Sequence, residues 1–156
     1  MSHGLDTDTH IYCYEHEFYP LSNFSSFQLV WCDLLFATSE HAYHWEKFHG
    51  HPEVQHAILH ARSAHDAFRV SRDNASLVRS DWVEVRVGIM RHILRAKVSQ
   101  HPYVLKKLLQ TGARQIVENS WRDSFWGWGE GHDGENMLGR LWMEIRSEVC
   151  TNRQEP

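Results

Sequence analysis

Four side chains capable of chemistry recur at helical spacing in residues 38–48. Glu40, Tyr43, His44 and Lys47 are three or four residues apart, so an α-helix would place them on one face. That face would carry a carboxylate, a phenol, an imidazole and an amine, the types of group that acid–base chemistry uses. An ordinary amphipathic helix with a solvated polar side is the alternative, and this pattern alone leaves it open.

The expected helix has recognisable ends. Thr38 or Ser39 is the predicted N-cap, and Glu40 falls in the first turn, where the helix dipole favours a carboxylate. Gly50 and Pro52 are expected to end the helix. Its opposite, largely apolar face carries His41, Trp45 and Phe48.

A second candidate group lies in a loop rich in Trp and Gly, residues 121–135. Asp123 closely precedes Phe125-Trp126-Gly127-Trp128. A carboxylate beside aromatic rings could hold a sugar and stack a base. The alternative is a set of core tryptophans with a surface acid nearby. Arg72, Arg79 and Arg86 are likewise phosphate ligands if they converge, and otherwise helix surface.

Two kinds of motif, one for dinucleotide binding and one for metal binding, lack the neighbouring elements or residues that such sites need. Gly129-x-Gly131-x-x-Gly134 has dinucleotide-binding spacing, but it follows no clear buried strand and no βαβ unit follows it, so a Rossmann fold is rejected. A phosphate-binding loop and a flexible linker both stay open for this segment. Among the thirteen histidines, His56 with His60 and His41 with His44 are spaced to share a helix side, but neither pair has the HExxH spacing with its inserted glutamate, and no cysteine lies nearby. We therefore predict no metal site and no cofactor.

Composition favours a cytoplasmic protein. The 156 residues are enough for one domain, and no apolar run approaches the length of a membrane helix or a signal-peptide core. Cys13, Cys32 and Cys150 are odd in number and far apart, which argues against a disulfide framework. We expect a reduced, cytoplasmic chain with no membrane partner.

Charge is distributed unevenly around the net value of −4. Residues 62–114 hold eleven Lys or Arg against four Asp or Glu, whereas the rest holds five basic and sixteen acidic residues. A basic middle part suits a phosphate-bearing ligand that docks at one place. Helices that simply carry arginines outward would give the same count.

Periodicity and turn residues predict the remaining elements. Strands are expected at 11–14, 27–31, 34–36 and 115–118, the middle two as a hairpin turning at Cys32-Asp33 without the usual glycine. Further helices are expected at 53–62, 63–70, 81–96, 102–109 and 136–149, with loops at 15–24, 73–80 and 121–135. Ser63, Asp81 and Asn136 are the predicted N-caps of three of these helices.

These elements predict an α+β fold: one helix-rich domain with a small antiparallel sheet. Its expected bounds are residues 11–150, with flexible termini at 1–10 and 151–156.

An ordered series of short motifs resembles the NADAR family, also called YbiA-like, which is named for a proposed link to NAD and ADP-ribose. The series covers nearly the whole chain beyond the first dozen residues: Leu21-Ser22-Asn23-Phe24, Thr38-Ser39-Glu40-His41 with Lys47-Phe48, Arg72, Asp81-Trp82, Thr111-Gly112, Ile116-Val117-Glu118, Asp123-x-x-Trp126-Gly127, and Asn136-x-Leu138-Gly139-x-Leu141-x-Met143-x-Ile145-Arg146.

The resemblance implies a YbiA-like fold and hydrolysis of an N-glycosidic bond. Known activities in that family are cleavage of the ribosylamino intermediates of early riboflavin synthesis and removal of ADP-ribose from guanine in DNA. This sequence departs from the family where Cys32-Asp33 replaces a glycine, and at His44, where members often carry glutamine. The second departure lies on the expected site face and bears on substrate choice.

On this hypothesis the chain is a metal-independent N-glycosidase, and its preferred substrate is a phosphorylated N-riboside. Glu40 stabilises charge or activates water, and Asp123 orients the ribose or assists proton transfer. In a different mechanism, Lys47 attacks the opened sugar and forms a Schiff base. The expected substrate-binding residues are Asn23, Tyr43, His44, Arg72, Trp82, Trp126, Gly127 and Asn136, with Lys47 also holding phosphate.

Three other functions stay open at this stage. The chain could remove ADP-ribose from guanine in DNA, with ADP-ribosylated DNA as its partner. It could bind ADP-ribose or a related nucleotide without catalysis. It could also serve only as an interaction domain, with its Trp-rich loop packed against another protein.

Overall fold

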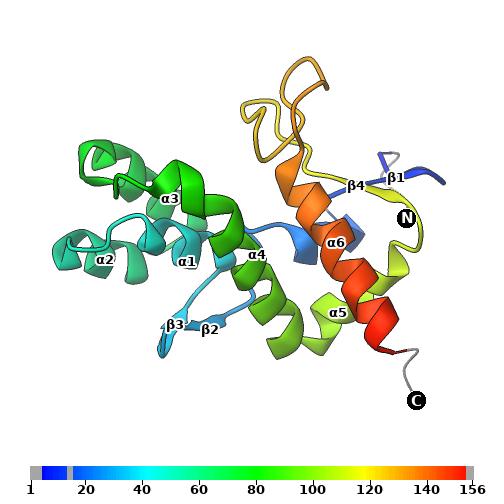
Figure 1. Cartoon of the computed structure of the whole chain (residues 1–156), viewed down its shortest axis with the longest axis horizontal. Helices are drawn as coiled ribbons and strands as arrows, with labels where there is room; N and C mark the ends of the chain where they lie inside the picture. Colours follow the sequence, from blue (N-terminus) through cyan, green and yellow to red (C-terminus); the bar gives the residue numbers. More distant parts are fainter. Residues whose placement is uncertain (1–4, 14–15, 154–156) are drawn as a thin grey trace. The chain divides into compact units, whose positions relative to one another are not determined.

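Helices dominate the chain, as the apolar periods predict (Figure 1). The computed structural model describes residues 5–13 and 16–153. The chain divides into two compact units, one made of 1–22 with 102–156 and the other of 23–101. The predicted α+β class is confirmed, with two two-stranded sheets among the described residues.

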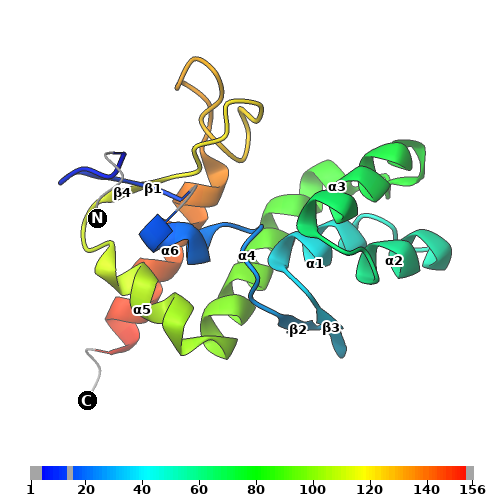
Figure 2. The same ribbon diagram turned by 180° about the vertical axis from the view of Figure 1, so that it is seen from behind.

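The 23–101 unit is built around helix α1, Ser39–Glu46, which contacts three other helices (Figure 2). These are α2, Pro52–Leu59, α3, Ala64–Asp73, and the long α4, Trp82–Gln100. A short 3₁₀ helix, η2, Ala75–Leu77, connects the last two. One apolar cluster in this unit consists of Phe48, Val54, Ile58 and Ala67, with Trp45 and Val70 packed against it.

A hairpin completes this unit. Strands β2, Leu29–Trp31, and β3, Leu34–Phe36, pair antiparallel, as predicted. Both turn residues have positive φ, 49° at Cys32 and 60° at Asp33. A two-residue hairpin with the right twist requires that conformation, so the tight turn forms without its preferred glycine.

All three predicted N-cap residues of this unit directly precede their helices, and two of them make a capping hydrogen bond. The Thr38 hydroxyl accepts the His41 N–H, and the Ser63 hydroxyl accepts the Asp66 N–H at 3.0 Å. Asp81 is the N-cap of α4, as predicted, but its side chain makes no capping bond. Its carboxylate instead accepts two hydrogen bonds from Arg79, at 2.6 and 2.8 Å, because a guanidinium can occupy both carboxylate oxygens at once.

The second unit combines a segment from the start of the chain, 1–22, with the segment 102–156. Strand β1, His10–Tyr12, lies parallel to β4, Gln115–Val117, a parallel pair that the predicted antiparallel sheet did not include. A 3₁₀ helix, η1, His16–Leu21, forms where a loop was expected. Tyr14 and Glu15, the predicted strand end and loop start, lie outside the described residues.

Helices α5, Pro102–Gln110, and α6, Met137–Asn152, complete this unit. The predicted apolar stripe of α6 is buried at Leu138, Leu141, Trp142 and Ile145. The Trp142 indole N–H donates to the Leu21 carbonyl at 2.9 Å, which ties α6 to η1. The helix also lies against β4 at Gly139, where an added Cβ would sit 2.0 Å from the Ile116 carbonyl oxygen.

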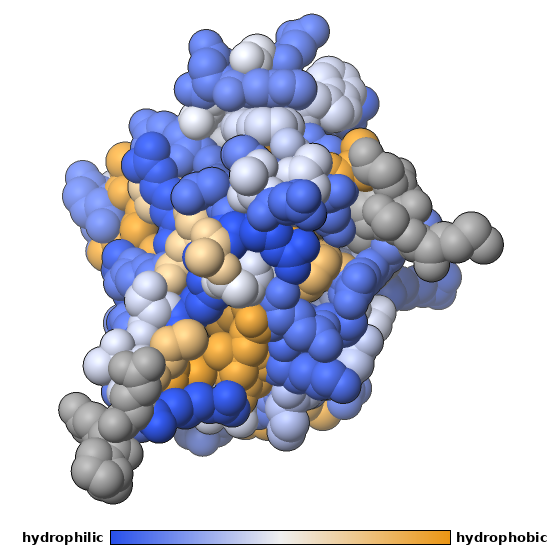
Figure 3. Space-filling view, turned by 90° about the vertical axis from the view of Figure 1, so that its right-hand side faces the viewer, coloured by the Kyte–Doolittle hydropathy of each residue, from blue (hydrophilic) through white to orange (hydrophobic). Residues whose placement is uncertain are grey.

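One surface view shows mostly hydrophilic side chains with scattered apolar patches (Figure 3). Within residues 5–13 and 16–153, none of the helices has the length and apolar character needed to cross a bilayer.

Replacing Gly139 by Ala should destabilise the fold strongly. The new methyl group would overlap the Ile116 carbonyl, and backbone cannot move aside cheaply, so we expect a loss of about 3 kcal/mol in the free energy of unfolding, measured by urea denaturation. Gly88 in α4 is the matched control, since nothing lies within 4 Å of its Cβ position. Gly88→Ala should be neutral or stabilising. Equal stabilities of the two variants would contradict the packing of α6 on β4.

Candidate functional site

The polar face predicted for residues 38–48 forms and is largely buried. The Glu40 side chain is 11% exposed and that of His44 is 4% exposed. One oxygen of Glu40 lies 2.7 Å from Nε2 of His44, one helical turn away. A carboxylate this poorly hydrated is stable only with hydrogen-bond partners, and His44 supplies one.

The protonation of His44 fixes the direction of this bond. Burial lowers the pKa of the His44 imidazole below its ordinary value, and the Glu40 carboxylate offsets that shift only in part. In the neutral ring bonded to an ionised carboxylate, Nε2 carries the proton and donates it to Glu40. Nδ1 is then an acceptor, and it is buried without a hydrogen-bond partner in the described structure.

Lys47 lies on the same face, one turn after Tyr43 and His44. Its ammonium is 5.0 Å from the Tyr43 ring centre, 5.6 Å from that of Trp82, and 3.3 Å from the Ser71 hydroxyl. Aromatic faces attract a cation without neutralising it. The structure therefore brings Lys47, Tyr43 and Trp82 together, with Tyr43 and Trp82 ring centres 5.1 Å apart.

Asn23 joins this group at the start of α1. Its backbone carbonyl accepts the Glu40 N–H at 3.2 Å, and its amide nitrogen lies 3.5 Å from the sulfur of Met90. The side-chain oxygen is buried with no hydrogen-bond partner. Together, Asn23, Glu40, Tyr43, His44, Lys47 and Trp82 form what we call the Glu40 group.

Arg72 is oriented differently from the prediction that it would hold phosphate with Lys47. Its guanidinium is 62% exposed and pairs with Asp73 at 3.3 Å. No contact of Arg72 with the Glu40 group occurs among the described residues. Its phosphate-binding role stays a prediction. Arg79 likewise pairs with Asp81 and contacts His49.

The other predicted site residues belong to the second unit. One oxygen of Asp123 accepts hydrogen bonds from the N–H groups of Phe125, at 2.9 Å, and Trp126, at 2.7 Å. This carboxylate therefore stabilises the turn that contains Trp126. Gly127 is required there, because a Cβ would approach the Glu118 carbonyl to 2.8 Å. The catalytic role of Asp123 stays a prediction.

Asn136 does not cap α6 with its side chain, contrary to the prediction. It adopts a left-handed conformation with φ of 48°. Its amide instead donates to the Ile116 carbonyl at 2.8 Å and accepts the Glu118 N–H at 2.9 Å. Asn136 therefore links the loop to β4. Because its side chain makes these long-range hydrogen bonds, it does not make the local capping bond.

The glycine-rich segment is neither a flexible linker nor an open phosphate loop. The Gly129 N–H donates to the Ser120 carbonyl and the Gly134 N–H to the Trp128 carbonyl. A Cβ on Gly134 would lie 2.6 Å from the Ser124 carbonyl oxygen. Close approach of the backbone therefore explains Gly134, and a positive φ of 71° explains Gly129.

Sequence reasoning missed two neighbours of the Glu40 group. Ser71 accepts the Lys47 hydrogen bond, and the Phe68 ring packs edge-on against His44, with ring centres 5.8 Å apart. Ala64, Ala67 and Ser71 are the buried positions of α3, spaced three and four apart. That spacing was a signal for Ser71 as an inward-facing residue. Over the described part of the chain, no cluster of three or more His, Cys, Asp or Glu is placed to hold a metal ion.

Comparisons with known proteins give consistent matches. The model of the NADAR domain matches residues 11–150. N-glycosidase YbiA of Escherichia coli is 31% identical over 148 residues, which are 95% of this chain and 92% of that protein. An N-glycosidase of Nostoc punctiforme is 36% identical over 130 residues, 82% of this chain and 83% of that protein.

A third relative is a longer protein. A riboflavin biosynthesis protein of Vibrio vulnificus is 39% identical over 144 residues, or 89% of this chain, but the chain spans only 38% of its length. Among solved structures, the NMR structure of Escherichia coli YbiA matches with a TM-score of 0.85 and 31% identity. The match covers 97% of this chain and 91% of the YbiA chain, and it confirms the predicted YbiA-like fold.

The lowered pKa of His44 predicts a dependence of stability on pH. Near the ordinary His pKa of about 6.5, the unfolded chain binds more protons than the folded chain, because the folded-state pKa lies lower. The contribution of His44 to stability is thus complete above that pH and is lost as pH falls toward the folded-state pKa. Urea denaturation across this range should show a shallower pH slope for His44→Gln than for the wild type.

The control for this experiment is His56→Gln, which removes an exposed imidazole on α2. Its slope should follow the wild type. If His44→Gln also kept the wild-type slope, the account of His44 as a buried neutral imidazole would be wrong.

Proposed function

Because this chain belongs to the NADAR family, we propose that it is an N-glycosidase that hydrolyses the bond between a base and a phosphorylated ribose. The observation that carries the proposal is the buried Glu40–His44 pair with Lys47 one turn away. A module that only binds anions gains little from a carboxylate held at the ligand, whereas hydrolysis needs one. The relatives named N-glycosidases support the same class of reaction.

Cleavage of an N-glycosidic bond develops positive charge at the anomeric carbon of ribose. A nearby carboxylate stabilises that charge and accepts a proton from the water whose oxygen bonds to the carbon. The C–N bond breaks, and the proton taken from water is passed on to the leaving base, so that one water is consumed and the carboxylate is regenerated. Glu40 supplies the carboxylate in this proposal. His44 positions it, since its Nε2–H occupies one carboxylate oxygen and leaves the other to face the substrate.

Lys47 holds the phosphate of the substrate. Its ammonium lies near the Tyr43 and Trp82 rings and the Ser71 hydroxyl, and these groups leave its positive charge available to an anion. Trp82 offers a ring face for the base. No metal enters the reaction in this proposal.

The preferred substrate class is a ribosylamino phosphate of early riboflavin synthesis. ADP-ribosyl-guanine in DNA is the second candidate, and it needs a surface that tolerates flanking phosphates. Three arginines of the basic middle part are paired with carboxylates close in sequence, Arg69 with Asp66, Arg72 with Asp73, and Arg79 with Asp81. This pairing reduces the charge available to a DNA strand. A cytoplasmic location belongs to the same proposal.

Glu40→Gln should abolish turnover and spare binding. Glutamine keeps the shape and can still accept the His44 hydrogen bond, but it neither stabilises the cation nor takes a proton. We expect the rate of base release, followed by chromatography, to fall on the order of 10²-fold or more, with little change in ligand affinity by calorimetry.

Glu53→Gln is the matched control, since that carboxylate is 69% exposed on α2 and should not affect turnover. Full activity of Glu40→Gln would contradict the assignment. A lysine adduct trapped by borohydride during wild-type turnover would instead favour the Schiff-base mechanism at Lys47.

Substrate preference gives a separate prediction. Catalytic efficiency should be higher on the free ribosylamino phosphate than on ADP-ribosyl-guanine in single-stranded DNA, and only weakly dependent on salt. A protein that neutralises several DNA phosphates loses affinity steeply, with log K falling by about 0.7 to 0.9 per contact with log salt. A preference for the DNA adduct with such a slope would reverse the order of the two substrates.

A further inference from the structure

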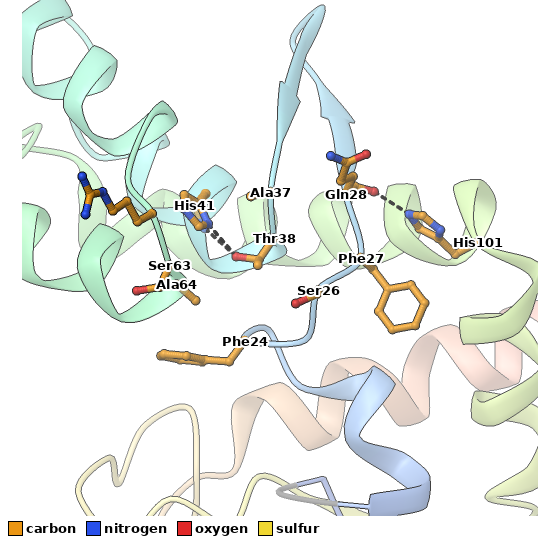
Figure 4. A pocket seen from close by; sticks show the side chains of 11 residues that line it. Phe24, Ser26, Phe27, Gln28, Ala37, Thr38, His41, Ser63, Ala64 and His101 are labelled. Carbon is orange, nitrogen blue, oxygen red and sulfur yellow. Dashed lines mark hydrogen bonds between the residues drawn. The ribbon is translucent and has the colours of Figure 1, made fainter.

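A pocket of about 600 Å³ opens in the 23–101 unit on the His41 side of α1 (Figure 4). The segment before β2, the starts of α1 and α3, and His101 contribute its eleven lining residues. Glu40, His44 and Lys47 are not among them. The pocket is within the usual size range of ligand sites, about 300–1,000 Å³.

Part of the wall is fixed by internal hydrogen bonds. His41 is fully buried, and its Nε2 donates to the Ala61 carbonyl at 3.1 Å, because a carbonyl can only accept. In the neutral ring, Nδ1 then accepts from the Thr38 hydroxyl at 2.8 Å. His101 bonds the Gln28 carbonyl in the same way. Figure 4 shows the His41–Thr38 and His101–Gln28 bonds, which hold these four residues in the wall of the pocket.

Three other lining groups are available to a ligand. Arg62 and Ser26 are exposed, and in the described part of the chain neither side chain makes a hydrogen bond or ion pair. The Ser63 oxygen accepts the Asp66 N–H, which leaves its own O–H free to donate. The pocket therefore presents one exposed guanidinium and two hydroxyl donors.

The charge around the pocket is one-sided. None of the eleven lining residues is acidic. The carboxylates in the first turns of the two helices are bonded elsewhere, Glu40 to His44 and Asp66 to Arg69. The starts of both helices add partial positive charge at the Thr38 and Ser63 caps. These features all favour an anion with several acceptor oxygens.

The rim adds an aromatic surface. Phe24 is 42% exposed, and Figure 4 shows its ring beside the start of α3. From this combination we infer that the pocket binds a nucleoside phosphate, with its phosphate on Arg62, Ser63 and Ser26 and its flat base on Phe24. This second binding site is independent of the N-glycosidase proposal.

Titration of adenosine monophosphate tests the site without any turnover assay. In the wild type, amide NMR signals of Ser26, Ser63 and Ala64 should shift. Arg62→Gln should weaken the binding measured by calorimetry about 10- to 100-fold, the loss expected for hydrogen bonds to a charged group. Arg140→Gln is the matched control, an exposed arginine of α6 outside the pocket, and should bind like the wild type.

Phe24→Ala separates the two parts of the ligand. It should weaken binding of adenosine monophosphate and leave binding of inorganic phosphate unchanged. The inference is overturned if the wild type binds neither probe, if Arg62→Gln binds as tightly as Arg140→Gln, or if the shifts are confined to the amides of Glu40 and Lys47.

Discussion

The hydrogen bond between Glu40 and His44 is the constraint on which the candidate site depends. A carboxylate that is nine-tenths buried loses most of its hydration, and it stays ionised only if the protein replaces that hydration. The Nε2–H of His44 does so at 2.7 Å, and the start of α1 adds a favourable field.

The rest of the 23–101 unit holds α1 in that place. Thr38 caps the helix, the Asn23 carbonyl accepts the Glu40 N–H, and the rings of Tyr43 and Phe68 enclose His44. On the other side, the fully buried His41 fastens the helix to the carbonyl of Ala61. The two histidines thus differ in role although they are three residues apart: His41 fixes the helix and His44 fixes the carboxylate.

Local patterns in the sequence predicted much of this arrangement. Spacing of three and four placed Glu40, Tyr43, His44 and Lys47 on one face, because such spacing is a geometric property of any α-helix. Thr38 and Ser63 were predicted as caps since a cap needs only the next three residues. The family assignment rested on the order of many short motifs, and the match over residues 11–150 confirms it.

The errors share a physical cause, which is competition from distant or unpredicted partners. Asp81 and Asn136 have good capping side chains, but Arg79 and the β4 backbone bind them instead. The parallel pairing of β1 with β4 joins segments about a hundred residues apart, and no local pattern reports such a contact. Which of several exposed arginines meets a phosphate also depends on tertiary placement, so the role of Arg72 stays a prediction.

The central claim is that a neutral His44 donates its Nε2–H to an ionised Glu40. Side-chain ¹⁵N NMR of the histidines at neutral pH tests it most directly, with His44→Gln to assign the signal. We expect a neutral His44 ring with a protonated Nε2 and an unprotonated Nδ1. A doubly protonated ring, or a proton on Nδ1 with Nε2 bare, would contradict the account.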